Sequence, residues 1–125
     1  MNAVRIGFHH EFDRAVVQDY FRKRVEWYEQ RLAAPATVSR KDEYDDRSHI
    51  VLATDGRQCL GGLRATVRRP GDTRLLPTEH VCDGLRVSDL FPEAGLPNTP
   101  HAELSKLVIV SDDGPLPLTN DLGFR

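Results

Sequence analysis

The sequence predicts an α/β protein of the α+β sandwich type, in which helices pack on a central, mostly antiparallel sheet. Three observations lead to this fold class. Residues 11–32 place apolar side chains on one helical stripe. Residues 48–67 contain two strand patterns joined by Asp55-Gly56, a hairpin turn signal. Residues 107–110 form an apolar run rich in β-branched side chains, as in a strand buried on both faces of a sheet covered by helices.

Length and composition indicate a single domain, residues 1–125. The chain is 39% hydrophobic and 29% charged, which is ordinary for a globular domain. Its net charge of −2 gives no electrostatic reason to bind nucleic acid or an anionic membrane. No apolar run approaches the roughly 20 residues that span a bilayer, and the N-terminal sequence has no signal-peptide core. Cys59 and Cys82 are expected to be free thiols. A cytoplasmic location is therefore expected.

The N-terminal region predicts a strand followed by a helix. Residues 4–8 alternate apolar and polar side chains over a short span, as in a strand. From residue 11 to residue 32 the pattern predicts an amphipathic helix, either continuous or broken in two. Pro35 rules out a longer helix. The helical stripe consists of Phe12, Val16, Tyr20, Arg24 and Tyr28.

Arg24 is the charged member of this stripe, and two interpretations are open. Its aliphatic stem could pack on the core while its guanidinium group reaches water, which the spacing alone favours. Alternatively, the side chain could point inward and hold a carboxylate. The first interpretation makes Arg24 a surface residue, and the second makes it part of a buried ion pair.

A polar loop is predicted for residues 33–48, with acids crowded at its centre. Four of the five residues from Asp42 to Asp46 carry a carboxylate. Charge runs of this kind are usually solvated surface. The run could instead bind a cationic substrate or pair with an internal arginine. A divalent metal is a third option, but the glycine and asparagine scaffold of a calcium loop is missing, and we predict no metal site.

Two strands are predicted next, over residues 48–54 and 58–67, with the hairpin turn between them. Gly61 and Gly62 would weaken the second strand unless a bulge or a close approach of backbone or ligand requires them. Residues 75–90 mix apolar and turn signals, which is typical of a short helix or turn between loops.

Polar side chains precede the apolar run of residues 107–110. Glu103, Ser105 and Lys106 stand at the entrance of this strand. Polar groups in such a place are unfavourable unless they are paired, and they are often placed there for function. We therefore expect a pocket around Glu103. No further periodic segment is predicted after Val110.

The order of these features resembles the acyl-homoserine-lactone synthases. These enzymes belong to the broader group of GNAT-fold N-acyltransferases, which includes the N-acyl amino acid synthases. The matching features, from Val4 to Val110, are a strand and a helix carrying FRKRVEWY, then Asp-Glu-Tyr-Asp, then Gly-Gly-Leu-Arg after a hairpin, then Glu-Leu-Ser-Lys opening an apolar strand. The resemblance implies a GNAT-like acyltransferase fold.

The family's N-terminal motifs fall on four substrate-binding positions of this chain. Its arginine with an aromatic residue four positions later matches Arg24 and Tyr28, with tyrosine in place of the usual phenylalanine. Its Asp-x-Tyr-Asp motif matches Asp42 and Asp45. The resemblance implies that these two acids face a cationic amine substrate and that Arg24 holds one of them in place.

The later motifs supply the remaining three positions. The family's arginine on the strand after the hairpin matches Arg64, and its glutamate and arginine three positions apart match Glu103 and Lys106. Lysine keeps the positive charge there but lacks the bidentate fork of arginine. The resemblance implies that Arg64 and Lys106 bind substrate. It also implies a bulge in the last strand, between Leu104 and Leu107, where a backbone N–H would polarise a thioester oxygen.

The implied reaction is N-acylation. An acyl group would pass from an acyl-carrier-protein or coenzyme A thioester to the amine of S-adenosylmethionine or a related amino compound, with no permanently bound cofactor. Because an ammonium group cannot attack, a base must first take its proton. The resemblance implies that Glu103 is this base. From the residues alone, Glu103 could instead pair with Lys106 or Arg64.

The resemblance also implies an incomplete enzyme. Family members continue for a further half, which carries the donor-binding elements and the acyl tunnel, so the chain is expected to be the N-terminal half with the C-terminal half missing. The last strand would then have an unpaired edge, suited to a homo-oligomer or to a partner chain that completes the sheet. Two other functions stay open. One is a non-catalytic half-domain that binds a partner or a small amine, and the other is a different GNAT enzyme, such as an N-acyl amino acid synthase or N-acetyltransferase.

Overall fold

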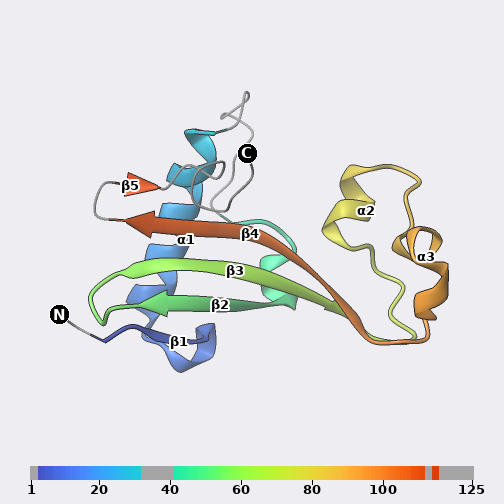
Figure 1. Cartoon of the computed structure of the whole chain (residues 1–125), viewed down its shortest axis with the longest axis horizontal. Coiled ribbons are helices and arrows are strands. Elements are labelled where there is room, and N and C mark those ends of the chain that lie inside the picture. Colours follow the sequence, from blue (N-terminus) through green and yellow to red (C-terminus); the bar gives the residue numbers. More distant parts are fainter. Residues whose placement is uncertain (1–2, 32–40, 112–113, 116–125) are drawn as a thin grey trace.

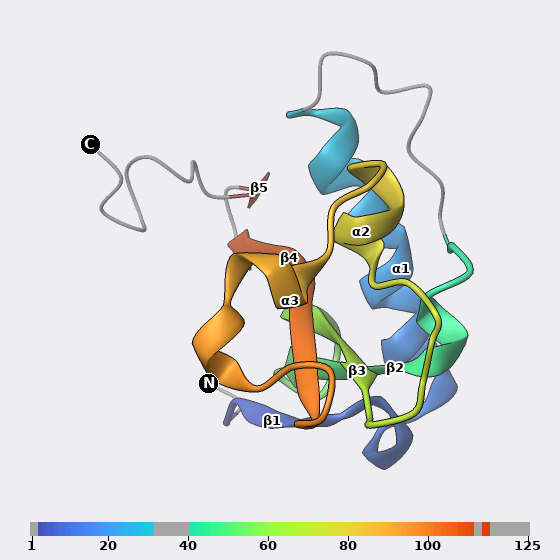
Figure 2. The ribbon, with the colours of Figure 1, turned by 90° about the vertical axis from the view of Figure 1, so that its right-hand side faces the viewer.

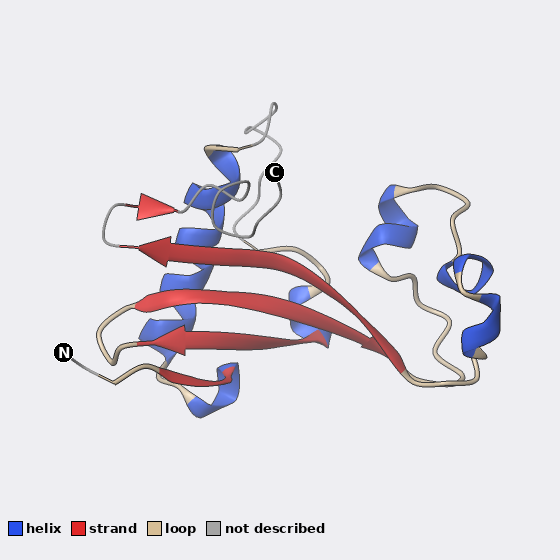
Figure 3. Cartoon of the chain, in the orientation of Figure 1, coloured by secondary structure: helices blue, strands red, loops and turns tan. Residues whose placement is uncertain are grey.

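The computed structural model describes residues 3–31, 41–111 and 114–115. Within them a five-stranded sheet has the order β1-β2-β3-β4-β5, and each neighbouring pair is antiparallel (Figure 1). The strands are β1 Arg5–Phe8, β2 Ser48–Thr54, β3 Cys59–Arg68, β4 His101–Ser111 and β5 Gly114–Pro115. The α-helices are α1 Arg14–Glu29, α2 Pro77–Val81 and α3 Val87–Leu90, and the 3-10 helices are η1 His9–Glu11, η3 Asp45–Arg47 and η4 Pro92–Ala94 (Figure 3). The predicted α+β fold class with a mostly antiparallel sheet is confirmed.

The helix predicted for residues 11–32 begins only at Arg14. The short turn η1 precedes it, and Phe12 and Asp13, both in extended conformation, separate η1 from α1. The predicted end at Leu32 lies outside the described residues. α1 buries Tyr20, Phe21 and Trp27, and it packs against β2, β3 and β4. The apolar stripe read from the sequence therefore faces the sheet.

Two glycines allow β3 to lie unusually close to its neighbours. A Cβ atom at Gly61 would be 2.6 Å from the Val108 carbonyl oxygen of β4. A Cβ atom at Gly62 would be 2.9 Å from the ring of Tyr20 in α1 and 2.8 Å from the Val51 carbonyl oxygen. The close approach that the sequence required of these glycines is confirmed, and it involves the protein's own backbone and core.

Gly61→Ala is expected to destabilise the fold because the added methyl group meets backbone that cannot turn aside. We expect the free energy of unfolding to fall by roughly 1–3 kcal/mol, as in other overpacked cores. Urea denaturation measures this change. Leu104→Ala is the control, since Leu104 is 68% exposed, and it should change the free energy by less than about 0.5 kcal/mol. A Gly61→Ala variant as stable as the parent would contradict this packing.

The two faces of the sheet differ. α1 covers one face, and Figure 2 shows this helix to one side of the strands. On the opposite face, Ile6 is 71% exposed and Leu104 is 68% exposed. The prediction that the run of residues 107–110 is buried on both faces is wrong, because Val108 is 1% exposed but Leu107 is 39% exposed. The run is apolar on both faces, yet α1 covers only one of them.

The segment between β3 and β4 forms a unit at one end of the sheet, made of α2, α3 and η4 (Figure 1). The sequence predicted only a short helix or turn here. Glu79 of α2 organises the unit, since its buried carboxylate accepts the N–H groups of Leu76 and Val87, each at 3.0 Å. It also forms a bidentate ion pair with Arg68 at the end of β3. One side chain thus joins α2 both to the sheet and to α3.

Glu79→Gln is expected to loosen this unit. Burial opposes ionisation of Glu79, but the hydrogen bonds from Arg68 and from the Leu76 and Val87 N–H groups outweigh it, so the pKa is held at about 2. The stabilisation is therefore complete above about pH 4.3, the ordinary glutamate value, and is lost as the pH falls through about 2. Leaving Arg68 buried without its partner should cost roughly 3 kcal/mol locally, which is about a hundredfold faster exchange of the Val87 amide.

Hydrogen exchange measured by NMR at pH 6 checks this prediction, with Glu93→Gln in exposed η4 as the matched control. The control should exchange like the parent. If the Val87 amide is equally protected in Glu79→Gln, the carboxylate does not hold α2 and α3 together.

β4 has a mostly open outer edge. β5 pairs with β4 through Val110 and Ser111, and the rest of this edge of β4 has no strand beside it among the described residues. The predicted unpaired edge is confirmed for this part of β4, whereas the short pairing with β5 was not predicted.

Both cysteines are free, as predicted, with Cys59 buried and Cys82 exposed.

None of the helices in the described ranges combines the length and the hydrophobicity that crossing a bilayer requires.

Candidate functional site

A buried ion-pair network joins α1, η3 and β3. Arg24, which is 2% exposed, donates to both carboxylate oxygens of Asp45, each at 2.8 Å. Arg64, which is 1% exposed, donates to Asp45 at 3.2 Å and to Asp42 at 2.6 Å. The inward interpretation of Arg24 is therefore correct, and the surface interpretation that its spacing favoured is wrong. A lone buried charge is strongly unfavourable, so each charge of this network depends on its partner for stabilisation. These ion pairs join the acidic loop to α1.

Asp45 is the centre of this network. Burial opposes its ionisation, but the hydrogen bonds from Arg24 and from the Asp42 N–H, together with the charge of Arg64, outweigh burial and hold the pKa of Asp45 well below its ordinary value. Its side chain is 0% exposed, and both of its oxygens accept hydrogen bonds. The geometry therefore makes Asp45 a support for the two arginines.

The acidic loop turns its carboxylates in different directions. The Asp42 side chain accepts the Tyr44 N–H at 2.9 Å, and the Asp45 N–H lies 3.3 Å from the Asp42 carbonyl oxygen. This tight turn places Asp45 inside and Asp42 half-buried, and it leaves Glu43 and Asp46 exposed. Part of the run is thus solvated surface and part is internal, a division that the run of charges did not indicate.

β4 has a bulge beside this network. Lys106 and Leu107 together oppose the single residue Leu63 of β3. Lys106 has a φ of 58°, in the left-handed region that few non-glycine residues adopt. The hydroxyl group of Tyr20 donates to the Lys106 carbonyl oxygen at 2.8 Å, and that of Tyr28 donates to the Leu107 carbonyl oxygen at 3.3 Å. α1 therefore holds the bulge, which falls where the resemblance implies it.

A cavity of about 550 Å³ lies between the acidic loop, β4 and α2. Five of the seven predicted site residues line it, namely Tyr28, Asp42, Arg64, Glu103 and Lys106. The other two, Arg24 and Asp45, do not line it. Asp45 instead accepts a hydrogen bond from Arg64, and Arg24 holds Asp45 in place. Residues from α1, the acidic loop, β3 and β4 are thus brought to one place.

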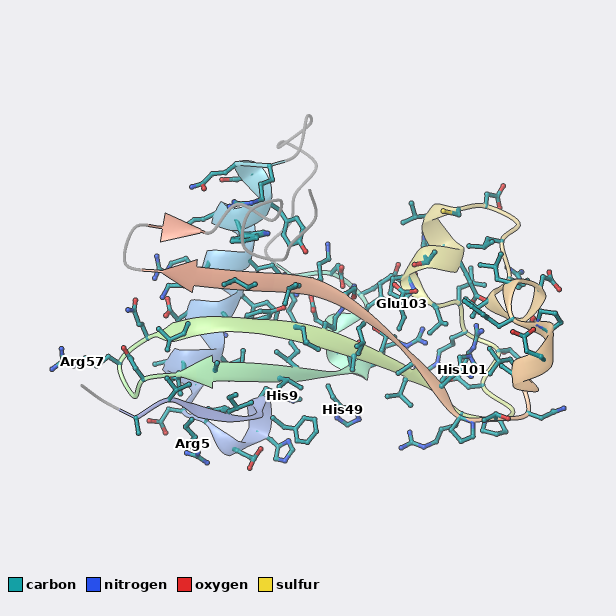
Figure 4. All side chains as sticks on the ribbon, in the orientation of Figure 1. Arg5, His9, His49, Arg57, His101 and Glu103 are labelled. Atoms are coloured by element: carbon teal, nitrogen blue, oxygen red, sulfur yellow. The ribbon has the colours of Figure 1, made fainter. Side chains whose placement is uncertain are left out.

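Glu103 reaches this cavity from β4 and lies beside α2 (Figure 4). One carboxylate oxygen, Oε1, accepts the Thr78 N–H at 3.0 Å. Among the described residues Glu103 forms no ion pair with Lys106 or Arg64, so that alternative is wrong. The second oxygen, Oε2, has no partner in the described part of the chain. Glu103 is therefore a half-buried carboxylate that is positioned through one oxygen and available through the other.

Lys106 lines the same cavity, also from β4, and its ammonium group rests on an aromatic ring. Its ammonium nitrogen is 5.3 Å from the ring centroid of Tyr28. Burial, and then the nearby charges of Arg24 and Arg64, lower the pKa of Lys106 below its ordinary value. The ammonium group is thus only partly hydrated, and it can donate hydrogen bonds to a ligand oxygen in the cavity.

The structure adds site residues that the sequence did not reveal. The Tyr44 hydroxyl group lies 2.7 Å from His80 Nδ1, and a Glu43 oxygen lies 3.5 Å from the same nitrogen. These contacts join the acidic loop to α2 at the cavity, which Tyr44, His80 and Thr78 all line. No signal in the sequence places α2 against the acidic loop. The described residues contain no cluster of three histidine, cysteine or acidic side chains suited to a metal ion.

Comparison with known proteins supports the fold. No protein-family model and no curated protein matches the chain. Among solved structures, it is similar to the crystal structure of LasI, an AHL (acyl-homoserine-lactone) synthase, with a TM-score of 0.52 and 21% sequence identity. The match covers 89% of this chain and 54% of LasI, so the chain spans about half the length of LasI. The chain therefore shares the fold of that part of an AHL synthase.

Proposed function

We propose that this chain is an N-acyltransferase that transfers an acyl group from an acyl-carrier-protein or coenzyme A thioester to the amine of S-adenosylmethionine or a related amino compound. The observation that carries the proposal is the position of Glu103. Its carboxylate lines the cavity from β4, the strand that carries the bulge, with one oxygen unpartnered among the described residues. The fold similarity to an AHL synthase favours this reaction class over others.

Carboxylates on the loop side of the cavity suit a cationic amine. Asp42 and Glu43 both line the cavity, and Arg64 fixes Asp42 through a hydrogen bond of 2.6 Å. The amine would lie between these carboxylates and Glu103. Lys106, on the strand side, would bind a carboxylate of the amino compound. The site thus offers a group of opposite charge for both the ammonium and the carboxylate of an amino acid.

The reaction needs one base and one group that polarises the thioester. Glu103 Oε2 takes a proton from the ammonium group, since only the neutral amine can attack. The nitrogen lone pair then forms a bond to the thioester carbonyl carbon, and the C–S bond breaks. The second amine proton passes to the departing sulfur, which leaves as a thiol, and Glu103 returns its proton to water. A backbone N–H at the bulge would stabilise the oxyanion that forms in between.

A non-catalytic half-domain that binds a partner is the second candidate function. One observation favours it, the open apolar face of the sheet, where Ile6 and Leu104 are 71% and 68% exposed. Ile6 also lines an apolar depression on this face, together with Val51 and Ile109, and exposed apolar surface of this kind often marks a protein contact. Other GNAT activities, such as N-acyl amino acid synthesis or N-acetylation, would use the same residues with a different amine or donor.

Mass spectrometry of solvent extracts tests the proposal without assuming a product. Cells that express the chain are compared with cells that express Glu103→Gln. A new acylated amine that disappears in the variant supports the acyltransferase and identifies both substrates. Identical extracts from the two strains, together with a protein that co-purifies with the chain, would favour the half-domain.

A further inference from the structure

We infer that a second cavity, beside Arg47, binds the carboxylate or phosphate group of a small anion, an inference that does not depend on the proposed function. This cavity has a volume of about 420 Å³, within the range of about 300–1,000 Å³ that is usual for small-molecule sites. The seven predicted site residues, all within the described ranges, do not line it. Its lining consists of Glu43, Tyr44, Arg47, Arg74, Leu75 and His80.

Arg47 carries two hydrogen-bond donors that have no acceptor. Its Nη1 donates to the Leu75 carbonyl oxygen at 2.9 Å, which fixes the guanidinium group at the end of η3. Its Nε and Nη2 are buried, and neither has a hydrogen-bond partner in the described part of the chain. Nε and Nη2 lie on one edge of the planar guanidinium group. That edge is a fork that can donate two parallel hydrogen bonds to a carboxylate or a phosphate group.

The other buried arginines show what this fork lacks. Arg64 donates to Asp45, and both side chains are buried. Arg68 forms its bidentate ion pair with Glu79, which is also buried. Each of these charges has an internal carboxylate, whereas Arg47 has no ion pair within the described ranges. Buried donors without an acceptor are unfavourable, and an anion in the adjoining cavity would satisfy them.

The acids near Arg47 are engaged elsewhere. Asp72, on the loop after β3, accepts hydrogen bonds from Nε and Nη2 of Arg74 at 3.0 and 2.8 Å, and a third from the Arg74 N–H. Glu43 lies 3.5 Å from His80 Nδ1, and its side chain is largely exposed, so water and salt screen its charge. The fork of Arg47 is therefore the group on which binding of an external anion depends.

The side chains around the cavity can admit an anion to the fork. Nε and Nη2 of Arg47 are shielded from solvent in the structure. However, the side chains of Glu43, Arg74 and His80 are each more than half exposed. Exposed side chains change rotamer within nanoseconds, so they can turn away as a ligand enters.

Titration of the full chain with methyl phosphate and with acetate, each compared with chloride at equal ionic strength, tests the site. NMR follows the Arg47 Nε–H and the Leu75 amide, and both should shift to saturation with at least one of the two anions. Arg47→Lys keeps the charge but loses the fork, so the affinity read from the Leu75 amide should fall by about tenfold or more. Arg57→Lys, at an exposed position in the turn between β2 and β3, is the matched control and should bind like the parent.

The two anions identify the ligand class. A tighter fit to methyl phosphate indicates a phosphate ligand, and a tighter fit to acetate indicates a carboxylate ligand. Two results would overturn the site. One is a response to both anions no larger than the response to chloride, and the other is equal affinity in the parent and in Arg47→Lys. Circular dichroism verifies that the variants are folded, and if Arg47→Lys is not, the shift of the Arg47 Nε–H in the parent decides.

Discussion

Asp45→Ala is expected to lower the free energy of unfolding by roughly 3–5 kcal/mol, the loss typical of removing one partner from a buried ion pair. The substitution leaves Arg24 and Arg64, 2% and 1% exposed, without the carboxylate that both share. Because α1, η3 and β3 meet at this carboxylate, the loss affects the whole fold. Urea denaturation followed by circular dichroism measures it.

Asp46→Ala is the matched control for this prediction. Asp46 is the next residue, but its side chain is 79% exposed and pairs with Lys41 at the surface. Exposed ion pairs contribute about 1 kcal/mol or less. If Asp45→Ala and Asp46→Ala unfold at the same urea concentration, the buried network does not hold the fold together.

The same network predicts the direction of acid sensitivity. The folded pKa of Asp45 lies below its ordinary value, so the carboxylate stabilises the fold fully above about pH 3.9 and loses this contribution as the pH falls below the folded pKa. The parent should therefore lose stability on acidification through this range. Asp45→Ala should lose less over the same interval, and equal slopes would contradict the assignment.

Glu103→Gln is expected to reduce kcat/KM for acyl transfer by about 10²–10⁴-fold, the usual contribution of a general base. The fold should survive, because the glutamine carbonyl oxygen can still accept the Thr78 N–H that Glu103 accepts now at 3.0 Å. The melting temperature should stay within a few degrees of the parent value. Steady-state assays of thiol release measure the change.

A matched control variant separates the loss of a base from a general loss of activity. Glu29→Gln, an exposed acid at the end of α1, should behave like the parent. Unchanged turnover in Glu103→Gln would remove Glu103 from the mechanism.

Periodic patterns predicted most of the fold. The stripe that includes Tyr20 predicted α1, and alternation with the Asp55-Gly56 turn predicted the hairpin of β2 and β3, because local spacing decides which side chains share a face. The same reasoning failed for Leu107. Apolar side chains on both faces of a strand show that burial of both faces would be favourable, but they do not show that another element packs on each face.

Contacts of the site between charged side chains could be predicted from the sequence, whereas contacts with backbone groups could not. Complementary charges made the pairing of Arg24 with an acid one of two open interpretations. The partner of Glu103 is the N–H of Thr78, which any residue except proline would supply, so no side chain in the sequence indicates it. The contact between Tyr44 and His80 likewise depends on the placement of α2, which Glu79 fixes through two backbone N–H groups.

The most direct test of the acyltransferase is a reaction with the purified chain. Octanoyl-coenzyme A, or octanoyl-acyl carrier protein, is incubated with S-adenosylmethionine and with a mixture of amino acids, and free thiol and products are followed by a colorimetric assay and mass spectrometry. We expect thiol release matched by an N-octanoyl amine in equal amount, with both absent in Glu103→Gln. Thiol release at the rate of uncatalysed hydrolysis, from a folded parent with either donor and every amine, would contradict it.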